Sequence, residues 1–110
     1  MHCCGAVRAM IPLLIELGLD ILDVVQVSAR GMDLPGLQRD FGSRLTFCGT
    51  MCVQTLLVSG TPGDIRRAVA ERLRLFPAGG LILGPTNTIE LGTPLANIVA
   101  MYEAAGSLRA

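Results

Sequence analysis

The residues best suited to chemistry are the first five, Met1-His2-Cys3-Cys4-Gly5. His2 and Cys4 are two positions apart, a spacing that places both side chains on the same side of an extended segment. Neutral imidazole and thiolate are both good zinc ligands, so the two groups could converge on one ion. A catalytic zinc site needs three protein ligands and an open position, so a third ligand must come from elsewhere in the chain. The alternative is that this run only packs, because free cysteine behaves as a small buried hydrophobe.

Length, charge and cysteine content restrict the class of protein. The 110 residues make one domain at most, and a composition of 51% apolar and 16% charged residues is typical of a piece of a larger core. Nine basic and nine acidic residues cancel, so neither nucleic acid nor a membrane is expected as a partner. Four cysteines without a signal peptide indicate reduced thiols in the cytoplasm.

Helical and extended patterns alternate along the chain. Helical spacing predicts helices over 5–17, 34–41, 62–76 and from 95 onward, and nearly continuous apolar runs predict strands over 21–26, 45–49 and 81–84. Pro12 should kink the first helix or delay its start to about Ile11. Asp33, Thr61-Pro62 and Thr93-Pro94 are expected to start the later helices, and the arginines of 62–76 are expected to form a solvated face.

Strands that are apolar on both faces require a parallel sheet with crossover helices, so the pattern predicts an α/β barrel or a doubly wound sheet. In both folds functional residues gather at the carboxyl ends of the strands. We expect Gln26, Gln54 and Asn87 to lie there as candidate substrate-binding residues. Alternatively, the two glutamines only form hydrogen bonds with backbone groups of the loops, and Asn87 is only a turn residue. The segments between strands and helices contain neither G-x-G-x-x-G nor a P-loop, so nothing indicates nucleotide binding. The sequence has a single histidine, His2, which leaves none for a Ser-His or Cys-His pair and argues against hydrolase chemistry.

Several short motifs, taken in order, resemble one family. They are His2-Cys3-Cys4-Gly5, Leu19-Asp20-Ile21-Leu22-Asp23-Val24-Val25-Gln26, Gly31-Met32-Asp33, Phe41-Gly42-Ser43-Arg44-Leu45-Thr46-Phe47, Gly60-Thr61-Pro62 and Thr93-Pro94-Leu95-Ala96-Asn97-Ile98. On these residues the chain resembles the C-terminal third of the uroporphyrinogen decarboxylase family, and in particular its cobalamin-linked methyltransferase branch. The resemblance implies that 1–110 is part of a TIM (β/α)8 barrel, with about three parallel strands and crossover helices.

The resemblance also implies a chemistry. In the methyltransferase branch the His-x-Cys element supplies two zinc ligands, here His2 and Cys4, and a third cysteine follows the strand that corresponds to 81–84. The matching position is Asn87, a poor zinc ligand, so zinc either takes Cys52 or is absent. The expected function is zinc-thiolate-assisted methyl transfer involving a corrinoid or a thiol, on a small molecule or together with a corrinoid protein.

Two other functions stay open. One is uroporphyrinogen decarboxylation in porphyrin biosynthesis, with a tetrapyrrole substrate. The other is an inactive truncated product, because a barrel closes only with eight strands, and the fragment alone is expected to be inactive. The missing strands would also leave exposed sheet edges through which the chain could associate with itself.

Overall fold

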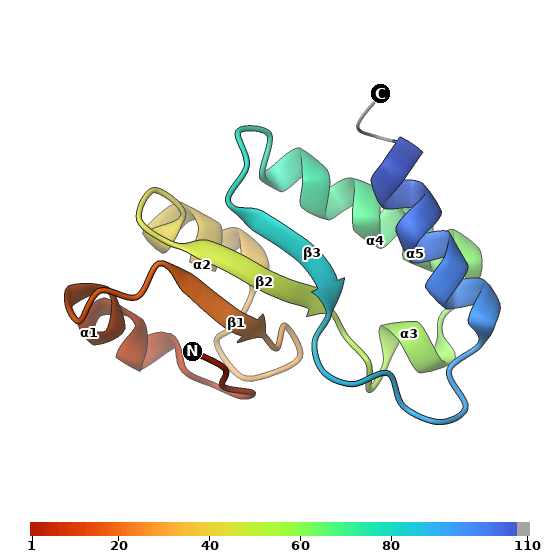
Figure 1. Cartoon of the computed structure of the whole chain (residues 1–110), viewed down its shortest axis with the longest axis horizontal. Helices are drawn as coiled ribbons and strands as arrows, with labels where there is room; N and C mark the ends of the chain where they lie inside the picture. The colour runs from red at the N-terminus through yellow and green to blue at the C-terminus, as the bar shows by residue number, and fades with distance from the viewer. Residues whose placement is uncertain (108–110) are drawn as a thin grey trace.

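Three short apolar segments form the strands in the computed structural model, which describes residues 1–107. All strands pair in parallel in the order β1-β2-β3, as the sequence predicts (Figure 1). β1 ends one residue before the predicted end at position 26, and β2 ends two residues after the predicted end at position 49. The strands are β1 (Ile21–Val25), β2 (Thr46–Met51) and β3 (Leu81–Pro85).

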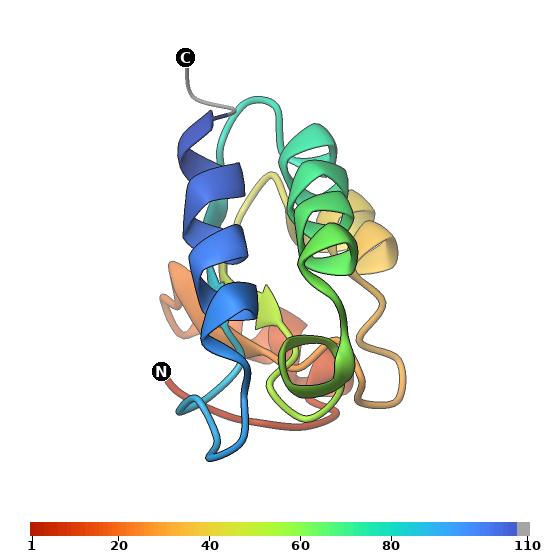
Figure 2. The same ribbon diagram turned by 90° about the vertical axis from the view of Figure 1, so that its right-hand side faces the viewer.

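Helices separate the strands along the chain, and α4 and α5 lie side by side (Figure 2). The first helix is much shorter than 5–17, because Pro12 fits the first turn of a helix that begins at Ile11. A four-residue helix after β2 was not predicted, since it is too short to show a period. The helices are a 3-10 turn (Arg8–Met10), α1 (Ile11–Glu16), α2 (Leu34–Phe41), α3 (Leu56–Ser59), α4 (Pro62–Leu75) and α5 (Leu95–Ser107).

Two of the three predicted helix starts have the expected hydrogen bonds. The Asp33 carboxylate accepts from the Gly36 N–H at 2.9 Å. Thr61 and Asp64 form a reciprocal capping box, with bonds of 2.8 and 3.2 Å. The third start was wrong, because the buried Thr93 hydroxyl has no hydrogen-bond partner among the described residues and α5 begins only at Leu95.

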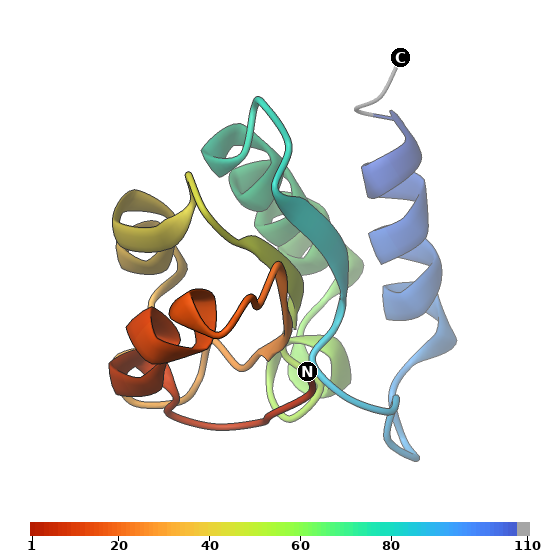
Figure 3. The same cartoon turned by 60° about the vertical axis from the view of Figure 1, so that its left-hand side comes forward.

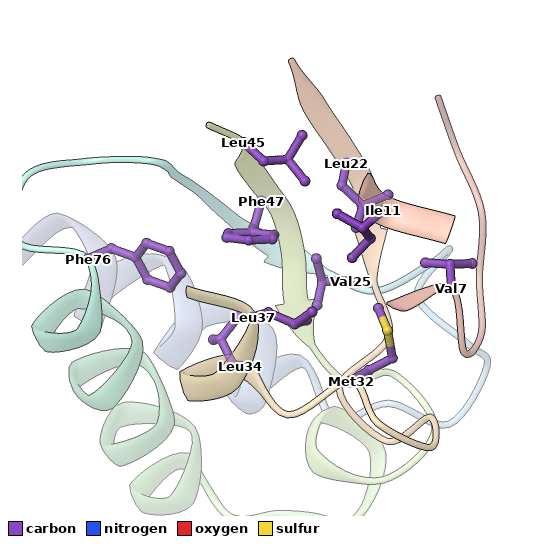
Figure 4. Packing of buried hydrophobic residues seen from close by; sticks show 10 residues of the cluster. All are labelled: Val7, Ile11, Leu22, Val25, Met32, Leu34, Leu37, Leu45, Phe47 and Phe76. Atoms are coloured by element: carbon purple, nitrogen blue, oxygen red, sulfur yellow. The ribbon is translucent and has the colours of Figure 1, made fainter. Parts of the chain in front are cut away.

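The main core lies where the first two helices meet the sheet. Phe47, the second residue of β2, is fully buried and meets Phe76 edge to face, with ring centroids 5.7 Å apart. A second cluster joins β2 to the helices α3, α4 and α5. The buried members of the main cluster, drawn in Figure 4, are Val7, Ile11, Leu22, Val25, Met32, Leu34, Leu37, Leu45, Phe47 and Phe76.

The face of the sheet opposite this core carries a more exposed row. Asp23, Cys48 and Ile82 are aligned across the three strands, and Ile82 is 49% exposed. Burial raises the pKa of the Cys48 thiol, and the neighbouring Asp23 carboxylate adds to the rise. The chain start extends the sheet on the β1 side, because the Cys3 N–H donates to the Asp23 carbonyl at 2.8 Å.

Arg72 corrects the expectation of a fully solvated arginine face on α4. Arg66, Arg67 and Arg74 are exposed, but the half-buried Arg72 guanidinium donates to the Thr50 carbonyl at 3.0 and 3.2 Å. Burial lowers the pKa of Arg72. Thr50 has a φ of 80°, so this arginine holds the end of β2 in an unusual backbone conformation.

The outer edge of β3 has no strand partner among residues 1–107, and Ile82 beside it is exposed. Unpaired edges template association with other chains, so we expect the isolated polypeptide to elute above its 11.6 kDa monomer mass. Size-exclusion chromatography with light scattering measures this, and a monodisperse monomer would contradict it.

In the described part of the chain no helix is long and apolar enough to cross a bilayer.

Candidate functional site

The extended N-terminal segment places His2 and Cys4 beside β1. His2 Nδ1 lies 2.9 Å from the Asp23 carboxylate, which can only accept a hydrogen bond when it is ionised. Nδ1 is therefore the donor, and in the neutral ring Nε2 keeps the lone pair. Nε2 lies 3.4 Å from Cys4 Sγ, within the about 4 Å expected of two ligands with zinc bonds near 2.0 to 2.3 Å.

Cys3 has a different environment from Cys4. It is half-buried and packs against the main core, whereas Cys4 is exposed. The alternation of neighbours on an extended segment predicts this difference. The two adjacent thiols are thus a natural pair for comparing a site role with a packing role.

Asn87 reaches the same sulfur from the loop after β3. Its Nδ2 donates to Cys4 Sγ at 3.4 Å, across 83 positions of sequence. Its Oδ1 accepts from the Thr88 N–H at 2.8 Å, and this bond fixes which end of the amide faces the sulfur. Figure 3 shows the start of the chain passing close to the loop that follows β3.

A second polar group lies at the carboxyl end of β1. The buried Gln26 side chain donates to Ser28 Oγ at 2.7 Å, to Gln54 Oε1 at 3.3 Å and to Cys52 Sγ at 3.7 Å. Burial raises the pKa of the Cys52 thiol, but hydrogen bonds with Thr55, Ser28 and nearby backbone outweigh it and leave the pKa lowered. Gln26 and Gln54 are therefore brought together as the sheet-edge argument predicts, and Cys52 lies with them.

Both groups of side chains border one cleft of about 360 Å³. Cys4 and Asn87 line it from one group, and Gln26 and Gln54 line it from the other. Glu90 is the carboxylate of this lining, which holds no lysine or arginine among the described residues. The described lining therefore combines three amide side chains with the Cys4 thiol.

The donor set fits zinc in part. His2 Nε2 and Cys4 Sγ are suitable in type and separation, and Asp23 orients the imidazole as carboxylates do in many zinc sites. Across residues 1–107, however, no group of three His, Cys, Asp or Glu side chains is placed to share an ion. Cys52 bonds instead to Gln26 and Ser28, so the structure does not bring it to the pair. Metal binding itself stays a prediction.

Sequence reasoning missed three residues of this site, namely Asp23, Ser28 and Glu90. A lone carboxylate inside an apolar strand was a usable signal for Asp23, because even a partly buried carboxylate favours a hydrogen-bonding partner. Ser28 and Glu90 lie in loops whose path the sequence does not specify.

Comparison with known proteins gives two matches. The family model of uroporphyrinogen decarboxylase (URO-D) matches residues 1–108. A solved structure, a methyltransferase from Methanosarcina mazei, superposes with a TM-score of 0.78 at 23% sequence identity, over 99% of this chain and 31% of that one. No curated protein matches. The likeness confirms the predicted fold, a part of a TIM-barrel-like α/β domain that spans less than a third of the similar structure.

Proposed function

The chain belongs to the uroporphyrinogen decarboxylase family, and from that membership we propose that it is part of an enzyme that transfers a methyl group to or from a thiol or a corrinoid. The observation that carries the proposal is the pairing of His2 Nε2 with Cys4 Sγ at 3.4 Å beside the cleft. The methyltransferase likeness of the fold is consistent with it. The corrinoid rests on the family resemblance alone.

We propose that His2 and Cys4 hold zinc at this position. When bound, zinc lowers the pKa of a coordinated thiol, so that the nucleophilic thiolate exists at neutral pH. Asp23 accepts the Nδ1 proton of His2 and so keeps the Nε2 lone pair directed toward Cys4. The Asp23 backbone is hydrogen-bonded to Met1 and Cys3 on either side of His2, which limits the freedom of the imidazole relative to the half-exposed Asp23 carboxylate.

The amide side chains of the cleft are proposed to bind substrate. Gln26 is anchored by Ser28 and Gln54, so it presents a fixed group in the lining of the cleft. Gln54 and Asn87 are exposed and line the same space. Because amides both donate and accept, this lining suits a small polar substrate.

The family also includes decarboxylation of a tetrapyrrole with several acid groups. Carboxylate groups are bound best by arginine, through paired charge-assisted hydrogen bonds. The described lining of the cleft offers Glu90 and no arginine or lysine, so it would repel an acidic substrate. The cleft therefore favours methyl transfer over decarboxylation.

The test compares two adjacent thiols. We expect Cys4→Ser to weaken zinc binding by about a hundredfold, because one of the two available ligands is lost. Cys3→Ser should change zinc affinity less than about twofold, since Cys3 packs against the core. Zinc competition with a chromophoric chelator measures both affinities, and methyl transfer should fall with zinc content in a complete barrel that carries this segment. Equal zinc binding by the two variants would remove the metal from the proposal.

A further inference from the structure

Arg72 differs from the other arginines of α4 in what it binds. Its Nε and Nη2 donate to the Thr50 carbonyl at 3.2 and 3.0 Å, and Nε also donates to the Thr50 hydroxyl oxygen at 3.2 Å. Its Nη1 donates to the Ala68 carbonyl at 3.0 Å. Thr50 is fully buried. Charge-assisted hydrogen bonds that converge on one carbonyl oxygen are strong, so Arg72 fixes the Thr50 backbone to α4.

Thr50 lies at the point where β2 extends beyond β1. The last pair between these two strands joins Gly49 to Val25, so Thr50 comes after the paired part of β1. Gly49 and Thr50 have φ of 94° and 80°, a conformation that is uncommon for a residue with a Cβ such as Thr50. Such a backbone persists only when its surroundings hold it in place. The guanidinium of Arg72 supplies hydrogen bonds where β1 no longer does.

The segment that follows β2 leads directly into the cleft of about 360 Å³. Val53 and Gln54 both line this cleft. The Val53 N–H donates to the buried Thr86 hydroxyl at 3.2 Å, next to Asn87 of the same lining. Gln54 Oε1 accepts from the buried Gln26 side chain at 3.3 Å. The position of Gln54 relative to Gln26 therefore depends on how the end of β2 is held.

Resting on the proposed function, we propose that Arg72 is a positioning residue of the substrate cleft. Arg72 lies outside the described lining of the cleft and acts through the backbone of Thr50. By holding the end of β2, it keeps the Gln54 amide within hydrogen-bond distance of Gln26. The relative placement of these two amides is thus set from α4, a helix that contributes no residue to the described lining.

Two substitutions at position 72 test this role. Arg72→Met keeps an apolar stem but removes every donor to Thr50. Arg72→Lys keeps the positive charge, but its single ammonium group cannot reproduce the planar pair of N–H groups. Arg74→Met is the matched control, because Arg74 lies exposed on the same helix. Circular dichroism shows whether each variant keeps its helices, and Arg72→Lys provides the same comparison if Arg72→Met does not fold.

The measurement is NMR spectroscopy of the isotope-labelled whole chain, which follows the nuclear Overhauser contacts of the Gln26 side-chain amide. In the natural chain this amide should contact both Gln54 and Ser28, because it donates to Gln54 Oε1 at 3.3 Å and to Ser28 Oγ at 2.7 Å. We expect Arg72→Met to lose the contact to Gln54 and to keep the contact to Ser28, which belongs to the loop after β1. Arg72→Lys should weaken the contact to Gln54, and Arg74→Met should retain both contacts.

The pattern of contacts separates positioning from general loosening of the fold. If Arg72→Met retains both contacts, the end of β2 stays in place without the guanidinium and the inference is wrong. If it loses both together, Arg72 stabilises the fold as a whole and does not position Gln54. An unchanged contact to Gln54 in Arg72→Lys would also overturn the role given to the paired N–H groups. The measurement requires neither zinc nor methyl transfer, so its failure is distinguishable from failure of the proposed function.

Discussion

Phe47→Ala is expected to unfold the chain. Phe47 is fully buried near the start of the central strand β2, and its ring meets Phe76 of the segment after α4 (Figure 4). Truncating a buried phenylalanine to alanine costs about 3 to 5 kcal/mol of free energy of unfolding, from lost transfer energy and the cavity left behind. Small domains have only about 5 to 15 kcal/mol, and an incomplete barrel should lie at the low end.

The measurement is the helical circular dichroism signal in buffer and its urea midpoint. We expect Phe47→Ala to lose most of the signal without denaturant, or to shift the midpoint far below that of the natural chain. Leu91→Ala is the matched control, because Leu91 is fully exposed in a loop and should leave the midpoint unchanged. Similar midpoints for the two variants would show that the core does not depend on Phe47.

Gly49→Ala is expected to have an effect of similar size for a different reason. Gly49 has a φ of 94°, a conformation that residues with a Cβ rarely adopt. An added Cβ would also overlap Cγ2 of the buried Val24 and lie 3.2 Å from the Pro85 carbonyl oxygen. Backbone strain and overpacking each cost about 1 to 3 kcal/mol, so we expect a total of about 3 kcal/mol or more.

Gly84→Ala is the comparison that isolates this explanation. Gly84 also lies in the sheet, but an added Cβ there meets nothing within 4 Å and its φ is not positive. We expect its urea midpoint to change by less than a third of the change in Gly49→Ala. If Gly49→Ala has the same urea midpoint as the natural chain, then Val24 and the end of β2 can adjust to the added methyl group. The tight packing around Gly49 would then not be needed for folding.

Most of the fold could be predicted, because it depends on local patterns that the sequence states directly. The apolar runs at β1, β2 and β3 and the Thr61-Asp64 capping box needed no knowledge of distant contacts. The failures involve tertiary context. Thr93 has good capping chemistry but lies one residue too early for α5, and Arg72 turns inward because Thr50 offers it a carbonyl oxygen.

The sequence predicts the sheet edge at which the candidate site lies, but it does not predict which side chains form hydrogen bonds there. The order of strands and loops brings Gln26, Gln54 and Asn87 to one cleft, as parallel topology requires. Which polar atoms meet there depends on loop conformation, so the bond from Asn87 to Cys4 and the cluster around Cys52 could not be read from spacing. Asp23 was missed because its partner lies 21 positions away.

The separation of 83 positions between Cys4 and Asn87 matters for how the protein is made. On the ribosome the segment with His2 and Cys4 emerges before Asn87, which follows 83 positions later than Cys4. During that interval the Cys4 thiol lacks its amide neighbour. The contact between the Cys4 sulfur and the Asn87 amide can therefore form only after translation has passed β3.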